Sequence, residues 1–397
     1  MNKEYYKKIA LKWAPIHYQY IKLDYDKNMK DVSFETKTDL LVPVNLDGYT
    51  NVCECGCRFD EHNTNNLQSN DVTKNCCNEF IRKYKNKEEE WDTRDIRNRL
   101  KKAKIKNLVP VVYYSIATTS NHFFILYSFY HANDEKHPND MEGCLVIIER
   151  DKENDENNRL VGMMTVAHLY FPRYVYKNRL KFDKESFLDI ITSDKNADKK
   201  RIKQIKKRLN ILGTQGNMEA DDENDTTRAL TQQETQGHGL YALGENLVFP
   251  FNIIRKIKTL FGKLDFVVYY PGTYAKPYDV YDLIRYKGMP HYSSLYYELV
   301  DIHDEQGLCH RISNNVNGNS TFNENGKFHG NSASPPWLWV EKKDGKELTF
   351  WNEPAELADL YFEPSDSTKP FIDNDGYKKT MSQNEDGHEH VCDFQKY

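Results

Sequence analysis

Five potential metal ligands lie close together in a short polar loop between two apolar runs. They are His131, Asp134, His137, Asp140 and Glu142. Asp140 and Glu142 are two residues apart where the second apolar run begins, so in an extended strand both side chains point to the same face. Carboxylates with an imidazole suit Mg²⁺ or Ca²⁺ best, and they also accept Mn²⁺ or Zn²⁺. The alternative is that Asp, Asn and His are present because they tolerate turn geometry.

Two further histidines are candidates for the same region. His168 stands near the end of the next apolar run, and an antiparallel arrangement of strands would bring it back toward the loop. His238 lies in the isolated segment QGHGLYALG. If the protein is an enzyme, His168 or His238 would be its general acid or base.

A Cys-rich segment offers a second metal site. Its cysteines are Cys53, Cys55, Cys57, Cys76 and Cys77. The first three alternate, so in a strand their sulfurs would share one face. This is not the C-x₂-C spacing of a zinc ribbon, and structural Zn²⁺, free buried thiols and disulfides remain open.

Two tryptophans near the end of the chain are candidate ligand-binding residues. Trp337 and Trp339 could form a platform on which a sugar ring stacks. Tryptophans spaced in this way on a strand also pack in the core or at its rim, which is the alternative.

The pattern of apolar residues predicts a fold built on strands. Four β-rich runs, separated by polar loops, predict an antiparallel meander over 109–117, 122–131, 143–150 and 160–171. Outside the meander, the sequence predicts two or three strands over 10–44, helices over 79–106, strand, helix and strand over 247–270, and a closing strand and short helix over 334–362.

These elements predict a mainly β (α+β) fold. We expect an antiparallel β-sandwich with peripheral helices, forming one domain over residues 1–362. The Cys-rich excursion at 50–80 and a helical or disordered insertion at 178–236 interrupt it, and a polar tail covers 363–397.

Charge and composition exclude several classes of function. The 55 Lys and Arg nearly balance the 60 Asp and Glu, so no basic field favours nucleic acid. No apolar stretch is long enough for a transmembrane helix, and the N-terminus lacks the features of a secretory signal. We therefore expect a soluble protein that is cytoplasmic or exported by a non-classical route. The patterns G-x-x-x-x-G-K-S/T, G-x-G-x-x-G and G-x-S-x-G are absent from the sequence.

The loop and its flanking strands resemble the core of the necrosis- and ethylene-inducing peptide 1-like proteins (NPP1 family, or NLP cytolysins). The resemblance is carried by the runs FILYSFYHAND and KHPNDMEGCLVII. It implies a divalent cation held by Asp134, His137, Asp140 and Glu142. VAHLYF, with His168, is similar to the family's His-Gly strand. WAPIHYQ and the PPWLW segment resemble the related Vps62-like domain.

The resemblance implies a metal-dependent protein that binds a membrane headgroup or glycan, as a toxin or effector would. Lys136 stands where the family has Gly, and Asn139 and Met141 replace a His and a Trp. Metal binding survives these differences better than lytic activity does. A metal-dependent hydrolase of a phosphate or glycosidic ester is the second hypothesis, although we favour a binding protein over an enzyme. A cytosolic structural protein without a ligand is the third.

Overall fold

The computed structural model describes about half of the chain. The described residues are 3–21, 33–42, 44, 101, 110–134, 138–167, 171–182, 215–218, 220–221, 227–235, 237–243, 265–272, 292–304, 307–308, 334–343, 346–372 and 378–380. The Cys-rich segment, almost all of the charged stretch at 79–106 and the amphipathic stretch at 251–262 lie outside them.

Short strands make up most of the described structure. They are β1 (Ile16–Ile21), β2 (Val111–Thr118), β3 (His122–Asn133), β4 (Pro138–Glu149), β5 (Arg159–Thr165), β6 (Arg173–Val175), β7 (Leu180–Phe182), β8 (Gln215–Asn217), β9 (Ala220–Asp221), β10 (Arg228–Gln233), β11 (Leu240–Ala242), β12 (Asp265–Gly272), β13 (Tyr292–Asp301), β14 (Val340–Lys343), β15 (Lys346–Thr349), β16 (Phe362–Pro364) and β17 (Lys378–Thr380). The helices are α1 (Lys3–Trp13), α2 (Phe34–Asp39), α10 (Pro354–Tyr361) and the 3₁₀ turns η5 (Asp155–Asn157) and η8 (Pro336–Leu338). The fold is therefore mainly β, as the sequence predicts.

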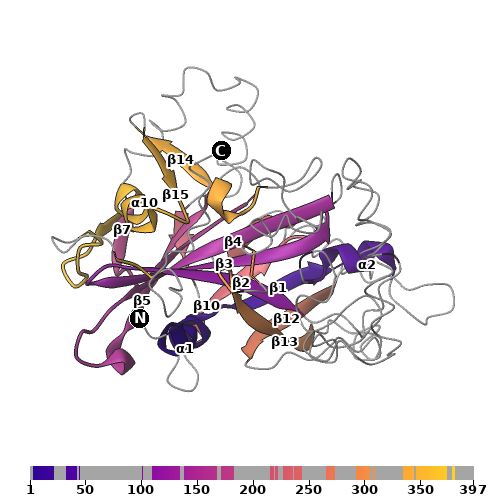
Figure 1. Ribbon diagram of the computed structural model, residues 1–397, viewed down its shortest axis with the longest axis horizontal. Helices are drawn as coiled ribbons and strands as arrows, with labels where there is room; N and C mark the ends of the chain where they lie inside the picture. Colours follow the sequence, from indigo (N-terminus) through magenta and orange to yellow (C-terminus); the bar gives the residue numbers. More distant parts are fainter. Residues whose placement is uncertain are drawn as a thin grey trace, which may run out of the picture.

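One large mixed sheet dominates the molecule (Figure 1). Its strands follow the order β11-β10-β1-β12-β13-β2-β3-β4-β5-β6-β8, with β17 on β2 and β9 on β10. The neighbours from β2 to β6 are antiparallel, which confirms the predicted meander. Pairs β1–β10, β12–β13 and β13–β2 are parallel. The expected pair of stacked antiparallel sheets is thus replaced by one mixed sheet, because late strands pair with the N-terminal β1.

The long strands β3 and β4 form the centre of this sheet. Every side chain of β3 is buried, from His122 to Asn133. A strand that is covered on both faces reads as a nearly continuous apolar run, which explains why the sequence identified this hairpin so clearly. Gly143 on β4 is required by close packing, since a Cβ there would lie 2.6 Å from the ring of Trp339.

The sheet curls so that its two halves approach each other. The edge strand β11 contacts β4 and β5, although it lies far from both in the strand order. The Leu240 N–H donates to the Val166 carbonyl, just beyond β5, over 3.1 Å. The inner face of the curled sheet is therefore closed off from solvent where β10, β11, β4 and β5 meet.

Residues 10–44 differ from the prediction of two or three strands. Among the described residues of this range, β1 is the one strand, and it lies between helices α1 and α2 in the sequence. In α1, Ile9, Ala10 and Trp13 share one face and are buried against the sheet. The Tyr127 hydroxyl donates to the Ala10 carbonyl over 2.7 Å, which fixes the helix on the meander.

The range predicted as an insertion, 178–236, contributes strands to the fold. β10, which we expected to be part of a linker, pairs in parallel with β1 and lies between β1 and the edge strand β11. β7 pairs with β16, and β8 pairs with β6. Part of the expected polar tail is also packed, because β17 pairs with β2 and Phe371 is buried. The domain boundaries themselves remain a prediction.

The segment at 334–362 agrees with the predicted closing strand and short helix. β14 and β15 form a hairpin, and the short helix α10 follows it (Figure 1). None of the helices in the described part of the chain is long and apolar enough to cross a membrane.

Candidate functional site

The β3–β4 hairpin brings the predicted carboxylates to one end of the sheet. In the register of this hairpin, Asp140 pairs with His131 and Glu142 pairs with Phe129. Asp140 and Glu142 alternate with Met141, so their side chains emerge on the same face of β4. Both are buried, with 3% and 2% of their surface exposed. Asp134, which follows β3, is 9% exposed, whereas His137 lies outside the described residues.

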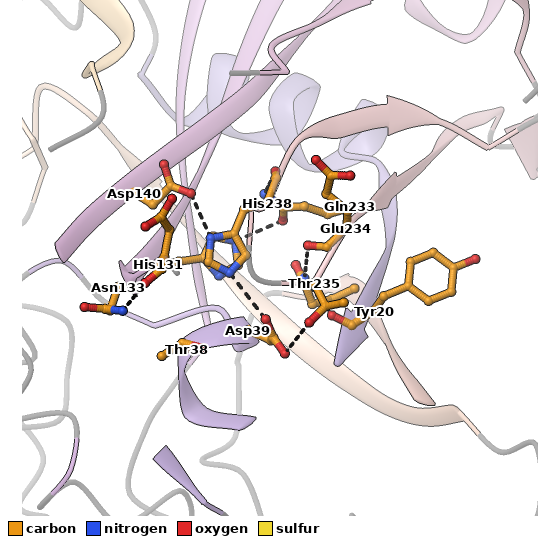
Figure 2. A network of polar contacts seen from close by, with 12 residues as sticks. Tyr20, Thr38, Asp39, His131, Asn133, Asp140, Gln233, Glu234, Thr235 and His238 are labelled. Atoms are coloured by element: carbon orange, nitrogen blue, oxygen red, sulfur yellow. Dashed lines mark hydrogen bonds and ion pairs between the residues drawn. The ribbon is translucent and has the colours of Figure 1, made fainter. Parts of the chain in front are cut away.

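His238 meets Asp140 inside the curled sheet, although it is far away in the sequence. It lies in the turn that joins β10 to β11, and its Nδ1 is 2.8 Å from Oδ2 of Asp140. Its Nε2 faces Oδ1 of Asp39, at the end of α2, across 3.5 Å. Figure 2 shows the imidazole between these two carboxylates. The contact therefore joins three separate elements of the fold.

The two carboxylates determine the charge of His238. Burial lowers the pKa of this fully enclosed imidazole, but hydrogen bonds and charge from Asp140 and Asp39 outweigh burial and raise it to about 9. The Thr235 hydroxyl donates to the other oxygen of Asp39 over 2.9 Å. His238 is thus an imidazolium at neutral pH, with both ring nitrogens directed at carboxylates.

A second imidazole, that of His131, stacks on His238. The two rings are 4.0 Å apart between centroids and nearly parallel, at 13°. Nε2 of His131 is 2.9 Å from Oε1 of Gln233, and the Gln233 amide nitrogen donates to the His238 carbonyl over 2.6 Å. Because a carbonyl cannot donate, the amide orientation is fixed and Nε2 of His131 must carry the hydrogen. Burial and the charge of His238 keep the pKa of His131 well below its ordinary value.

The buried polar residues continue from Gln233 along strand β1. His17 contacts the Thr231 hydroxyl through Nδ1 at 3.0 Å and Gln19 through Nε2 at 3.3 Å. Its ring packs against Phe129, with 4.5 Å between centroids. Burial lowers the pKa of His17 to about 3, so this imidazole is neutral. The inner face of the sheet therefore carries polar side chains where an ordinary core would be apolar.

Backbone conformation is unusual on both sides of the Asp140–His238 contact. Asn139, directly before Asp140, has φ 55°, and His238 has φ 52°. Both lie in the left-handed region, which residues other than glycine adopt uncommonly. The Tyr130 hydroxyl donates to Oδ1 of Asn139 over 2.7 Å and so holds this start of β4 in place.

The remaining predicted site residues are either outside the described residues or buried in the core. His168 and the five cysteines Cys53, Cys55, Cys57, Cys76 and Cys77 lie outside the described residues. Trp337 and Trp339 are buried, at 6% and 4% exposure. The indole of Trp339 donates to the Ser334 carbonyl over 2.9 Å and packs over Gly143. Burial of both indoles favours the core-packing alternative, and the sugar platform stays a prediction.

Metal-binding geometry is not complete within the described residues. No group of three or more His, Cys, Asp or Glu side chains there has an arrangement that could hold a metal ion. Of the four predicted ligands, Asp134, Asp140 and Glu142 are described, and the imidazole of His137 is not. The three of these four predicted ligands that are described are therefore all carboxylates.

The sequence analysis did not identify several residues of the buried network. They are Asp39, Gln233, Thr235, His17, Gln19 and Thr231. A local sequence pattern identifies four of them, because polar residues repeat there at the two-residue period of a strand. These residues are His17 and Gln19 on β1, and Thr231 and Gln233 on β10. Polar residues at this period on paired strands indicate a polar inner face. Asp39 has no such signal.

Comparison with known proteins gives one partial likeness. No family model matches the chain, and no curated protein matches it. Among solved structures, a chain described as "Crystal structure of non-toxic HaNLP3 protein" matches with 24% sequence identity and a TM-score of 0.15. The match covers 17% of this chain and 33% of that chain. The chain therefore has a partial structural match to an NLP protein, over about a third of that protein's length.

Proposed function

We propose that this chain binds a divalent cation at the loop end of the β3–β4 hairpin, and that it uses the cation to bind a polar headgroup or glycan. The ligands would be Asp134, His137, Asp140 and Glu142. Hard ions, Mg²⁺ or Ca²⁺, suit this oxygen-rich set best.

The burial of Asp140 and Glu142 on one face of β4 carries the proposal. Carboxylates are almost never fully buried unless they are paired or bind a metal. His238 already pairs with Asp140, and a cation shared by Asp140 and Glu142 would add positive charge at this end of β4. Two residues of strand place these groups roughly 7 Å apart along β4. An aspartate with two rotatable side-chain bonds and a glutamate with three can reach one ion from that spacing, since cation–oxygen distances are about 2.0–2.6 Å.

The described residues fit a cation in their chemistry but do not complete its coordination. Three carboxylates supply hard oxygen donors, while no described group of three is already arranged around a point. In the proposal, His137 at the hairpin tip completes the set. A bound ion would supply positive charge that orients a sugar hydroxyl or a phosphate oxygen.

A binding role is better supported than hydrolysis. An acid or base must reach the substrate with a free nitrogen or oxygen. His238 is fully buried and directs both nitrogens at carboxylates, and His131 is fully buried beneath it. These contacts favour a supporting role for both histidines over proton transfer, so the second hypothesis depends on His168, the other histidine that the sequence offers for that role.

The test is a titration of chelator-treated protein with Mg²⁺, Ca²⁺ and Mn²⁺ by calorimetry. We compare wild type with the double variant Asp140→Asn/Glu142→Gln, which keeps side-chain shape but removes both charges. Glu149→Gln is the matched control, because Glu149 is also a buried carboxylate of β4 but pairs with Arg159 at the opposite end of the strand. Wild type and control should bind one equivalent of cation, and the double variant should bind none.

Two further results decide between the hypotheses. If wild type and the double variant bind cations equally, the hairpin is not the site. If the hairpin binds a cation, flotation with glycosphingolipid vesicles tests the ligand class, using phosphatidylcholine vesicles as the control. Binding to the glycolipid that chelator reverses supports the proposal, and turnover of a phosphate or glycosidic ester would favour the hydrolase instead.

A further inference from the structure

One edge of strand β2 is shared by two partners, while β3 lies along the other edge. β13 follows the first half of β2 as far as Tyr114, where the Ile302 N–H donates to the Tyr114 carbonyl over 3.0 Å. The chain then turns away, because the Asp304 N–H donates to the Asp301 carbonyl over 3.0 Å. β17 pairs antiparallel with the second half of the edge, residues 116–118. Among the described strands, β17 is therefore the one that covers this half.

β17 follows a surface segment that one aromatic residue fixes to the meander. We call residues 365–372 together with β17 the C-terminal strap. Most of the side chains of 365–372 are exposed or half-buried, whereas Phe371 is fully buried. The Phe371 ring contacts two rings of β3, those of His122 at 5.0 Å and Phe124 at 6.3 Å between centroids. The strap thus has the form of an extended peptide with one aromatic anchor.

Side chains of the meander bind the backbone of the strap next to this anchor. The Asn121 amide nitrogen donates to the Pro370 carbonyl over 3.1 Å, and the Lys369 N–H donates to Oε2 of Glu149 over 2.8 Å. These bonds, the aromatic anchor and the strand pairing are all contacts that a separate peptide of the same sequence can make. Addition of a strand to a sheet edge, with a pocket for a side chain, is a common way in which domains bind extended peptides.

We propose that the edge of β2 at residues 116–118 and the Phe371 socket on β3 form a peptide-binding surface, whose partner in trans is the C-terminal strap of a second copy of this chain. Exchange of an identical element between copies is a low-cost route to association, because the same contacts form again. Within one chain the strap fills its own site, since a short connection gives an effective concentration on the order of millimolar. The surface therefore accepts a second strap only when its own is released. This inference does not depend on the proposed cation site.

The test releases the strap in the full-length chain and supplies it again as a peptide. The released variant is Phe371→Ala/Lys379→Pro/Thr380→Pro, which removes the anchor and two neighbouring N–H groups. One of these two N–H groups must point toward β2, because adjacent residues of a strand point to opposite sides. Lys379→Ala/Thr380→Ala is the matched control, since it keeps the anchor and both N–H groups. The probe is a fluorescein-labelled peptide of residues 365–380, followed by fluorescence anisotropy, and thermal melting reports folding.

Only the released variant should bind the peptide well. Wild type and the alanine control should bind it at least about tenfold more weakly, because their own strap competes for the site. The Phe371→Ala form of the peptide should lose about 30-fold or more in affinity for the released variant, as expected for removal of a buried aromatic anchor. A scrambled peptide of the same composition, and so of the same charge, should not bind.

Other outcomes overturn the inference. A folded released variant that binds no peptide, or binds the scrambled one equally, would make the strap a fixed part of the fold. Equal affinity in wild type and the released variant would place peptide binding elsewhere. If the released variant does not fold, Lys379→Pro/Thr380→Pro replaces it. Its amides at 116–118 should then exchange hydrogen faster than in the alanine control, and millimolar peptide should slow them again; exchange that the peptide leaves unchanged refutes the inference.

Discussion

Replacing Gln233 with leucine should destabilise the fold through the groups that the amide now satisfies. Gln233 is fully buried on the inner face of β10. Its Nε2 donates to the His238 carbonyl at 2.6 Å, and its Oε1 accepts from His131 at 2.9 Å. Leucine has nearly the same volume but can do neither. The change therefore leaves two polar groups buried without these partners.

The size of the effect follows from those two groups. Each buried group that loses its partner costs about 1–3 kcal/mol, so the pair costs about 2–6 kcal/mol. A buried leucine side chain recovers about 1.5–3 kcal/mol through apolar burial. The net loss in the free energy of unfolding should therefore be about 2 kcal/mol.

Urea unfolding followed by circular dichroism measures this difference, with Gln232→Leu as the control. Gln232 is the neighbouring residue on β10, and its half-buried side chain points to the opposite face. The control should change stability by less than about 0.5 kcal/mol. If Gln233→Leu is as stable as Gln232→Leu, with the same slope against urea, the buried amide does not stabilise the fold through these two hydrogen bonds.

Three further changes test other parts of the structure. Gly143→Ala should cost about 1–3 kcal/mol in a urea titration, because the new Cβ would lie 2.6 Å from the Trp339 ring, and an unchanged midpoint would show that the ring can move. Tyr127→Phe should cost about 1 kcal/mol and speed proteolysis of α1, since the bond to the Ala10 carbonyl is lost; equal cleavage rates would contradict this. Burial raises the pKa of Asp301 to about 7, above the value in the unfolded chain. The protonated carboxyl therefore contributes to stability at low pH, and this contribution is lost as the pH rises from about 4 through 7. Asp301→Asn should accordingly gain stability relative to wild type between about pH 4.5 and about pH 7.5, and a difference that stays constant over this range would refute the assignment.

The meander was predictable because its strands carry their own signal. β3 and β4 are buried on both faces, so their apolar runs stand out against polar loops. The two-residue period of a strand also predicts that Asp140 and Glu142 share one face of β4, and the register of the hairpin agrees.

The elements that were missed depend on distant partners. In α1 the aromatic residues resemble a strand, and only the spacing of Ile9, Ala10 and Trp13 reveals a helix. β10 reads as polar linker because Thr231 and Gln233 face a buried polar network rather than an apolar core. Its place in the sheet follows from pairing with β1, which local patterns cannot show.

The position of the carboxylates on the hairpin was predictable, whereas the residues that contact them were not. His238 is a candidate in the sequence through its isolated segment QGHGLYALG, yet its two carboxylate partners come from other parts of the chain. Asp39 ends a short helix that the sequence suggested was a strand, so nothing linked it to the hairpin.

Because β1 pairs in parallel with β10, this part of the sheet can form only after a long stretch of the chain has been synthesised. His17 and its partner Thr231 are separated by 214 residues, so a ribosome that adds about 5–20 residues per second needs roughly 10–40 s to supply the second strand. During that interval the meander can form from its local contacts, while the backbone groups of β1 that will bond to β10 are still unpaired. A nascent chain arrested before residue 228 would therefore protect β2–β5 from amide hydrogen exchange but leave β1 unprotected. The hairpin carboxylates would then be in place before His238 emerges to meet them.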